Sequence, residues 1–277
     1  MDLSGELHQF VSLSKNCNGD IMPDTPEQEY RKLSKTLIMI PTYNEVGNVA
    51  PMIKRLLALK LDADILFIDD NSPDGTGNIL DKYAALYENI KVLHHTYKAG
   101  IGTAHQYGIE WAYNHCYIRL VTMDGDFTHS PEDIPKLLEY SDNYDIVIGG
   151  RHARKDSIEG WTLWRKFVTI GAHQFTTRLL RLPYDATTTF RIYRLDKIPS
   201  EIWWMVKSTG YSFFIESLCI LNENKFTIYD VPVVFPPRAA GTSKLTIKDM
   251  VYWFFIVKKL ALQIRTHHRK LYLPVQF

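Results

Sequence analysis

Short apolar runs and stretches with helical spacing alternate along residues 36–150. The runs at 37–40 and 65–68 each end at polar residues, which is typical of strands buried on both faces of a parallel sheet. Val49, Ile53, Leu56 and Leu57 recur at helical spacing. The pattern predicts strands at 37–40, 65–68, 90–93, 118–123 and 145–148, and helices over 49–57, 79–87, 103–113 and 131–140.

The regular alternation of strand, short loop and helix predicts an α/β fold. Such units build a mainly parallel sheet with helices on both faces. Ser130 is the predicted N-cap of helix 131–140, whose first turn holds Glu132 and Asp133. Beyond residue 151 the pattern loosens, and we expect helices over 161–180, 211–221 and 245–265 and strands at 189–193 and 227–235.

Three segments differ in pattern. Residues 1–35 have no sustained periodicity and are predicted to be a flexible extension. Residues 36–250 carry the α/β pattern and are predicted to form one domain. Residues 251–277 contain no Asp or Glu but several basic and aromatic residues, and are predicted to form a basic, aromatic helix and tail.

Composition narrows the class of protein. Apolar residues make up 45% and charged residues 23% of the 277 residues, which excludes a disordered or collagen-like chain. The net charge of +1 gives no reason to expect a nucleic-acid partner. We find no leader-like apolar segment, and no apolar stretch of about 18 residues that could span a membrane.

Polar clusters follow three of the predicted strands. Ligands of open α/β sheets bind at the carboxyl ends of the strands, so these clusters mark the expected site. Asp124-Gly125-Asp126 offers two carboxylates that suit Mg²⁺ or Mn²⁺ bound together with substrate phosphates. A solvated turn or a helix cap is the alternative for this motif alone.

Two further clusters suit a nucleoside. Asp69 and Asp70 directly follow the strand that ends at Ile68, and carboxylates there can accept hydrogen bonds from a base or ribose. Tyr43 can stack on a base, and Glu45 can accept from its N–H groups. The glycine-rich phosphate motifs GxGxxG and GxxxxGK[ST] are absent, which excludes an ordinary dinucleotide-binding or P-loop domain.

Together the motifs resemble those of family 2 glycosyltransferases with the GT-A fold. Within that family they are most similar to the branch of dolichyl-phosphate mannose synthases and related polyprenyl-phosphate sugar transferases. The motifs are PTYNE at 41–45, DDNSPDGT at 69–76, KAGIGTA at 98–104, MDGDFTHSPED at 123–133, GGR at 149–151, GWTLWR at 160–165, TFRIYR at 189–194, GYSFFIES at 210–217 and VPVVFPPRAAGTSKL at 231–245.

The resemblance implies a role for each matching residue. Nucleotide-sugar binding would fall to Pro41, Tyr43, Glu45, Ile68, Asp70, Lys98, Asp124, Gly125 and Asp126. Asp124 and Asp126 would hold the metal, Mg²⁺ or Mn²⁺. Catalytic residues would be Asp124 and Asp126 together with Arg151, Arg165, Arg238 and Lys244, the last four surrounding the donor and acceptor phosphates. Residues 36–250 would form the catalytic domain.

The implied reaction transfers a hexose, with mannose as the first choice, from a GDP- or UDP-sugar to a polyprenyl phosphate with inversion. The acceptor phosphate is already an anion, so the reaction needs no strong general base. A transferase acting on a glycan hydroxyl is the alternative, with Glu216 or Asp185 as its base. An inactive nucleotide-sugar-binding module is a third interpretation, against which the intact Asp124 and Asp126 argue.

The sequence departs from the family pattern in the acceptor half. Thr188-Thr189 stands where members often have Ser-Gly, and Thr209 stands where members often have Lys before the Gly-Tyr pair. The resemblance further implies a peripheral protein on the cytosolic face of a membrane, which in a eukaryote is the endoplasmic reticulum. Its partners would be the membrane surface and small membrane-anchoring subunits, with no nucleic acid.

Overall fold

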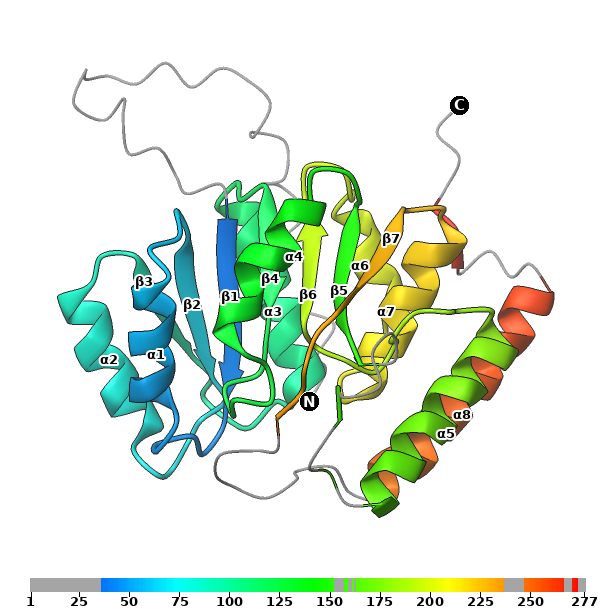
Figure 1. Cartoon of the computed structure of the whole chain (residues 1–277), viewed down its shortest axis with the longest axis horizontal. Helices are drawn as coiled ribbons and strands as arrows, with labels where there is room; N and C mark the ends of the chain where they lie inside the picture. The colour runs from blue at the N-terminus through cyan, green and yellow to red at the C-terminus, as the bar shows by residue number, and fades with distance from the viewer. Residues whose placement is uncertain are drawn as a thin grey trace.

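The computed structural model describes residues 36–151, 157–158, 161, 163–236, 247–266 and 271–273. A seven-stranded sheet forms the middle layer, in the order β3-β2-β1-β4-β6-β5-β7. Helices cover both faces (Figure 1). The strands are β1 (Thr36–Thr42), β2 (Asp64–Asp69), β3 (Ile90–His94), β4 (Arg119–Thr122), β5 (Ile146–Gly150), β6 (Arg191–Arg194) and β7 (Ile228–Pro232). The α-helices are α1 (Val49–Ala58), α2 (Thr76–Leu86), α3 (Ile101–Asn114), α4 (Ile134–Tyr140), α5 (Leu163–Leu180), α6 (Glu201–Met205), α7 (Ser212–Glu223) and α8 (Ile247–Arg265).

The sheet is parallel except at β6. That strand pairs antiparallel with both β4 and β5, while β5 pairs parallel with β7. The expected α/β class with a mainly parallel sheet is therefore confirmed. Because β6 runs the other way, its amino end reaches the same sheet edge as the carboxyl ends of β4 and β5.

Alternation along the strands builds two separate cores. In β1, Leu37 and Met39 face the layer of α3, α6, α7 and α8, whereas Ile38 and Ile40 face α1, α2 and α4. All four side chains are buried, because successive residues of a strand point to opposite faces and both faces are covered. The sheet is thereby a rigid support for the loops at its edges.

The observed elements differ from the predicted ones at a few places. The predicted helix over 131–140 is a short 3₁₀ turn, Pro131–Asp133, that continues into α4. The Ser130 side chain makes no capping bond to the backbone, and instead donates to Glu132 Oε2 at 2.7 Å. Helix α6 was not predicted, because five residues are too few to show a period.

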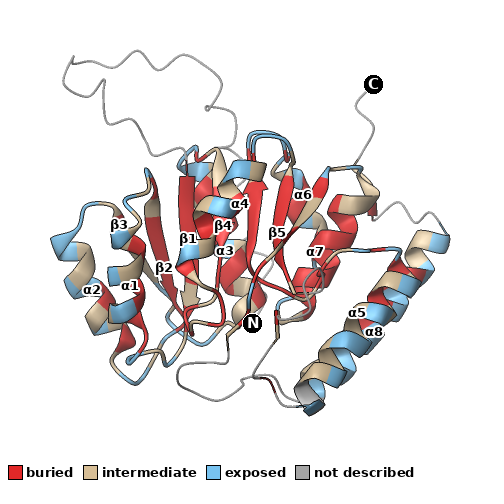
Figure 2. Cartoon of the chain, in the orientation of Figure 1, coloured by how far each residue is buried: buried red, intermediate tan, exposed pale blue. Residues whose placement is uncertain are grey.

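Helices α5 and α8 lie beside each other at the β7 end of the molecule, and Figure 2 shows mostly exposed and half-exposed residues along them. Helix α8 packs on α7 through Val257 and Leu260, and it stacks Phe254 on Phe175 of α5, with ring centroids 4.4 Å apart. It begins at Ile247 and so spans the predicted boundary between 250 and 251. None of the helices in the part of the chain that the structure describes combines the length and the hydropathy that a membrane-spanning helix requires.

Candidate active site

The site is built at one edge of the sheet, where the loops after β1, β2 and β4 lie side by side. Strand β1 is parallel to both neighbours, with Thr42 opposite Asp69 and Met39 opposite Thr122. The backbone N–H of Asp70 donates to the carbonyl of Thr42 at 2.9 Å, which continues the β1–β2 pairing into the loops. The predicted clusters at 41–45, 69–74 and 124–126 therefore share one edge.

Asp70 organises the loop that leads into α3. Its two carboxylate oxygens accept from the backbone N–H groups of Ala99 (2.7 Å) and Gly100 (2.9 Å), and Oδ1 lies 2.8 Å from His95 Nδ1. The side chain is almost fully buried. In this structure Asp70 thus fixes the 95–100 loop, which carries Lys98.

Lys98 lies over the ring of Tyr43, with Nζ 3.8 Å from the ring centroid. This contact joins the loop after β3 to the loop after β1 in a cation–π arrangement. Glu45 accepts from the Asn48 side chain at 2.6 Å, and its backbone N–H donates to Thr76 Oγ1 at 2.9 Å. Of the predicted nucleotide-binding residues, Tyr43 and Lys98 are thus brought together by a ring contact, and Glu45 is held in the same loop by Asn48 and Thr76.

Asp74 connects the loops after β1 and β2. Its Oδ1 accepts from both the backbone N–H and the hydroxyl of Thr76, and its Oδ2 accepts from the backbone N–H of Val46. Burial raises the pKa of Asp74, but the hydrogen bonds from Thr76 and Val46 outweigh it and hold the pKa below the usual range. Asp74 thereby stays a carboxylate and shapes the loop.

The two aspartates after β4 lie on a tight turn. Asp126 is buried and its Oδ1 accepts from the backbone N–H and the hydroxyl of Thr128, at 3.1 and 2.6 Å. Phe127, between Asp126 and Thr128, has a φ of 62°, the left-handed conformation that such a turn requires. A Cβ on Gly125 would lie 3.4 Å from Ile40 and 3.8 Å from the Pro41 carbonyl, so the turn rests against the end of β1.

Two residues to which the sequence analysis assigned no role at the site, Thr189 and His129, position Asp124. Thr189 Oγ1 donates to Asp124 Oδ1 at 2.8 Å, and the Asp124 backbone N–H donates to His129 Nδ1 at 3.0 Å. His129 is buried between the rings of Phe190 and Phe235. His129 belongs to the motif at 123–133, but its pairing with its own turn could not be inferred from spacing.

Arg151 is held by a carboxylate. Its Nε and Nη2 donate to Asp185 Oδ2 and Oδ1, both at 2.8 Å, and Nη2 also donates to Thr187. Burial lowers the pKa of Arg151, but the charges of Asp185 and, more weakly, of Asp124 and Asp230 raise it above the ordinary value. Arg151 is therefore a fixed cation close enough to Asp124 to feel its charge.

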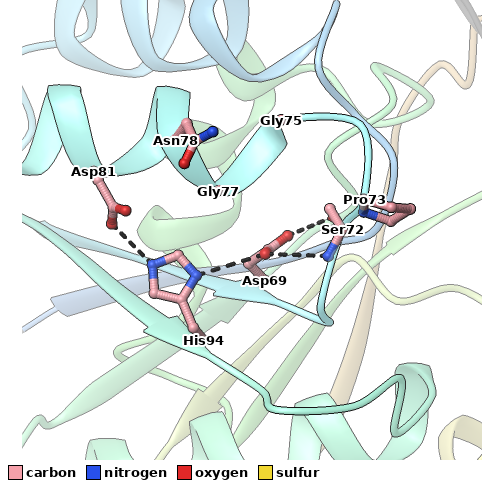
Figure 3. A pocket seen from close by; sticks show the side chains of 8 residues that line it. All are labelled: Asp69, Ser72, Pro73, Gly75, Gly77, Asn78, Asp81 and His94. Atoms are coloured by element: carbon pink, nitrogen blue, oxygen red, sulfur yellow. Dashed lines mark hydrogen bonds and ion pairs between the residues drawn. The ribbon is translucent and has the colours of Figure 1, made fainter.

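A polar cavity of about 340 Å³ lies on the α2 side of the same edge (Figure 3). The His94 ring lies between Asp81, 2.8 Å from Nε2, and Asp69, 3.5 Å from Nδ1. Burial lowers the pKa of His94, but the two carboxylates raise it above its usual value. Asp69 also accepts from the Ser72 backbone N–H and hydroxyl, so it faces this cavity and serves the loop rather than the Tyr43 side.

The remaining predicted residues are placed differently. Ile68 is fully buried beneath the edge, against α3. Arg165 lies in α5, but the structure does not describe its side chain. Arg238 and Lys244 lie outside the described residues.

The chemistry of Asp124 and Asp126 fits a hard divalent cation. No group of three or more His, Cys, Asp or Glu side chains within the described ranges could hold a metal ion. Mg²⁺ and Mn²⁺ commonly take only one or two carboxylates from the protein and complete their shell with water and substrate phosphates. Two carboxylates at a strand end, with Arg151 nearby, suit such a jointly held cation.

Comparison with known proteins defines the class. Residues 37–199 match the profile of glycosyl transferase family 2. Polyprenol monophosphomannose synthase of Mycolicibacterium smegmatis is 35% identical over 78% of this chain and 83% of its own length. Undecaprenyl-phosphate mannosyltransferase of Micrococcus luteus is 34% identical over 76% of this chain and 88% of its own length. The protein is a glycosyltransferase; it belongs to glycosyl transferase family 2.

Solved structures agree on the fold. Glucosyl-3-phosphoglycerate synthase from Mycobacterium tuberculosis, crystallised with Mn²⁺, UDP and phosphoglyceric acid, superposes with a TM-score of 0.56 at 15% identity. The match covers 83% of this chain and 78% of that one. S. aureus TarS in complex with UDP-GlcNAc gives a TM-score of 0.52, covering 81% of this chain and 66% of that one at 15% identity. The fold is therefore of the GT-A type, as expected.

Proposed function

We propose that the protein transfers a hexose, with mannose as the first choice, from a GDP- or UDP-sugar to a polyprenyl phosphate with inversion. The names of the two curated relatives support the sugar and the acceptor class. The resemblance of the motifs favours GDP-mannose as donor and dolichyl phosphate as acceptor. We assign residues 36–250 to the catalytic domain.

The observation that carries this proposal is that both carboxylates that could serve as a general base, Glu216 and Asp185, are already hydrogen-bonded within the protein. Glu216 is buried, and its Oε2 accepts from the backbone N–H groups of Lys207 (3.0 Å) and Ser208 (2.7 Å). Asp185 is buried and receives both arms of Arg151. Both carboxylates therefore have structural partners, which suits an acceptor that arrives already ionised and needs no base.

The other residues of the edge receive roles in the same proposal. Tyr43, Glu45 and Lys98 contact the nucleoside, supported by Pro41 and Asp70. Asp124 and Asp126 hold Mg²⁺ or Mn²⁺ with the donor diphosphate, and that cation supplies charge neutralisation for the leaving nucleoside diphosphate. Arg151, on which the charge of Asp124 acts, orients a phosphate. We propose that Arg165, Arg238 and Lys244 also bind the donor and acceptor phosphates.

The test is a transfer assay with matched acceptors. Purified protein is given GDP-[¹⁴C]mannose, UDP-[¹⁴C]glucose or UDP-GlcNAc, with either a short polyprenyl phosphate or the corresponding polyprenol and simple mannosides. We expect transfer from GDP-mannose to the phosphate and none to the hydroxyl acceptors. Transfer to a hydroxyl instead would refute the proposal and restore the glycan-directed alternative.

Glu216→Gln sharpens that test. Glutamine keeps the single oxygen that accepts both backbone N–H groups but cannot act as a base. We expect its kcat to stay within about threefold of wild type, whereas loss of a general base typically costs about 100-fold or more. A loss of that size in a folded Glu216→Gln protein would contradict the absence of a base.

We further propose that α5 and α8 place the enzyme on a membrane surface. Leu163 (85% exposed) and Phe167 (71%) project from α5, and Phe255 (66%) from α8, all on the helix pair at the β7 end. Lys258 and Lys259 of α8 are exposed as well. Apolar side chains flanked by lysine suit the interface of an anionic bilayer. The same proposal places the protein on the cytosolic face, with small membrane-anchoring subunits as further partners.

Vesicle binding tests this surface. We expect the protein to sediment with vesicles that contain phosphatidylserine more than with neutral phosphatidylcholine vesicles. The double variant Phe167→Ser/Phe255→Ser should lose binding. Leu86→Ser, an equally exposed apolar residue at the opposite side of the sheet, is the control and should bind as wild type. Equal binding of all three proteins would refute the assigned surface.

A further inference from the structure

Asp230 on β7 is a carboxylate that the proposed reaction does not use. Its Oδ2 accepts from the backbone N–H of Asp185 at 3.0 Å. Its Oδ1 is buried from solvent and has no hydrogen-bond partner among the residues that the structure describes. A buried carboxylate oxygen without a partner is costly when the group is charged. Asp230 is thus placed where the neutral, protonated form is favoured.

Asp230 lies directly behind the Arg151–Asp185 pair. A Cβ on Gly150 would lie only 3.1 to 3.3 Å from the Asp230 carboxyl group, so the carboxyl rests against the residue that precedes Arg151. Asp185 binds Asp230 through its backbone and Arg151 through its side chain. The charged and titratable groups that act on Asp230 and on this pair come from the surrounding elements: Arg151 and Asp124, Asp185 and Tyr184, Arg191 on β6, and His173 on α5.

The two carboxylates have different protonation requirements. Asp185 receives a bidentate guanidinium, which requires its ionised form. Burial, and then the charge of Asp185, raise the pKa of Asp230 to about 7, while the hydrogen bond from the Asp185 N–H and the charges of Arg191 and Arg151 oppose the shift more weakly. Asp230 therefore changes charge near neutral pH while Asp185 stays ionised.

We propose that Asp230 is a positioning residue, and that its charge determines how strongly Arg151 attracts the acceptor phosphate. This inference rests on the proposed function, in which Arg151 orients a phosphate of the reaction. With Asp230 neutral, the charges of Asp185 and, more weakly, of Asp124 act on Arg151. With Asp230 ionised, a further negative charge lies behind the pair, holds the guanidinium more firmly and repels the incoming anion.

Binding of a phosphate and the pKa of Asp230 are linked. If the bound phosphate raises that pKa by one unit, the affinity for the phosphate changes by about tenfold across the titration. We therefore expect the KM for a short polyprenyl phosphate to rise about tenfold between pH 6 and 8.5. The acceptor phosphate loses its second proton with a pKa of about 6. This ionisation is common to every variant and cancels when two proteins are compared.

The experiment compares wild type with Asp230→Asn and with Asp142→Asn. Asparagine keeps an oxygen for the Asp185 N–H but cannot ionise. Asp142 is an exposed carboxylate at the far end of β5, and its substitution removes the same negative charge that Asp230→Asn removes where Asp230 is ionised. We expect the ratio of wild-type KM to Asp230→Asn KM to rise about tenfold with pH. The kcat should change less than about twofold, and Asp142→Asn should follow wild type.

A constant KM ratio in active proteins would overturn the role of Asp230 and leave the proposed acceptor intact. Absence of transfer to polyprenyl phosphate in all three proteins would instead refute the proposed function. The two failures are therefore distinguishable.

Thermal unfolding supplies a readout that needs no activity. The folded state retains a proton on Asp230 that the unfolded chain, with a pKa of 3.8, releases. The stability of wild type should fall relative to Asp230→Asn as pH rises toward about 7, and the difference should then stay constant. If the difference in melting temperature between wild type and Asp230→Asn stayed constant from pH 5 to 8.5, Asp230 would not titrate as proposed, and the inference would be overturned.

Discussion

Replacing Gly102 by alanine tests whether the start of α3 must lie against the segment at 209–210. A Cβ at Gly102 would lie 2.5 Å from the carbonyl carbon of Thr209, 2.6 Å from its oxygen and 2.8 Å from the Gly210 oxygen. These atoms are backbone, so no side-chain rotation relieves the overlap. The Thr103 backbone N–H donates to the same Thr209 carbonyl at 3.1 Å, which fixes the approach.

The size of the effect follows from two opposing terms. Alanine favours a helix over glycine by about 0.5–1 kcal/mol, and less in a first turn where the helix is only beginning. Forcing an added carbon into a packed contact typically costs about 1–3 kcal/mol. The overlap should win, so we expect Gly102→Ala to lower the free energy of unfolding by about 2 kcal/mol.

Gly171→Ala is the matched control, because Gly171 is inside α5 and its added Cβ would meet no atom within 4 Å beyond the adjacent residues and backbone of its own helix. It should raise the free energy of unfolding by about 0.5–1 kcal/mol. Urea unfolding followed by circular dichroism measures both variants, and calorimetry measures nucleoside diphosphate binding. Displacement of α3 moves the loop with Lys98, so Gly102→Ala should also weaken nucleotide binding. A Gly102→Ala protein as stable as wild type would refute the close approach.

Three further substitutions test the site. Asp126→Asn keeps the contact with Thr128 but removes a charge, and it should lower kcat/KM by on the order of 100-fold at saturating Mn²⁺ with an unchanged melting temperature; retention of more than a tenth of the activity would exclude Asp126 as a metal ligand. Asp70→Ala leaves two backbone N–H groups unpartnered and should cost about 3 kcal/mol in urea unfolding, and a loss below about 1 kcal/mol would mean that the 95–100 loop does not depend on it. Arg151→Lys cannot form the bidentate pair with Asp185, so kcat/KM for the acceptor should fall more than about tenfold, and wild-type kinetics would remove Arg151 from the phosphate site.

The first half of the fold follows from the sequence because each strand is a short apolar run that ends at a polar cluster. The runs at 37–40 and 65–68 lie inside β1 and β2. The direction of a strand is not written in such a run, and so the antiparallel placement of β6 could not be predicted. Contacts between distant segments decide it, and the sequence around 191–194 carries no local signal of them.

The candidate site could be predicted as a set of residue types but not as a set of contacts. Because Asp70, Asp124 and Asp126 each follow a predicted strand, the sequence predicted that they share one sheet edge, and the structure places them there. Spacing could not tell that Asp70 serves the backbone of the next loop, nor that Thr189 holds Asp124. Such pairings depend on which oxygen faces which donor, a property of the folded chain.

The two sides of the site also differ in how far apart their contacting residues lie along the chain. On the nucleotide side, partners lie close in sequence: 28 residues separate Asn44 from Ser72 and 29 separate Asp70 from Ala99. On the phosphate side, 65 residues separate Asp124 from Thr189, and 45 separate Asp185 from Asp230. Contacts between distant residues form late, because long loops must close first. As the chain leaves the ribosome, the contacts of Asn44 with Ser72 and of Asp70 with Ala99 can therefore form before β6 and β7 exist, and the contacts of the phosphate side are completed last.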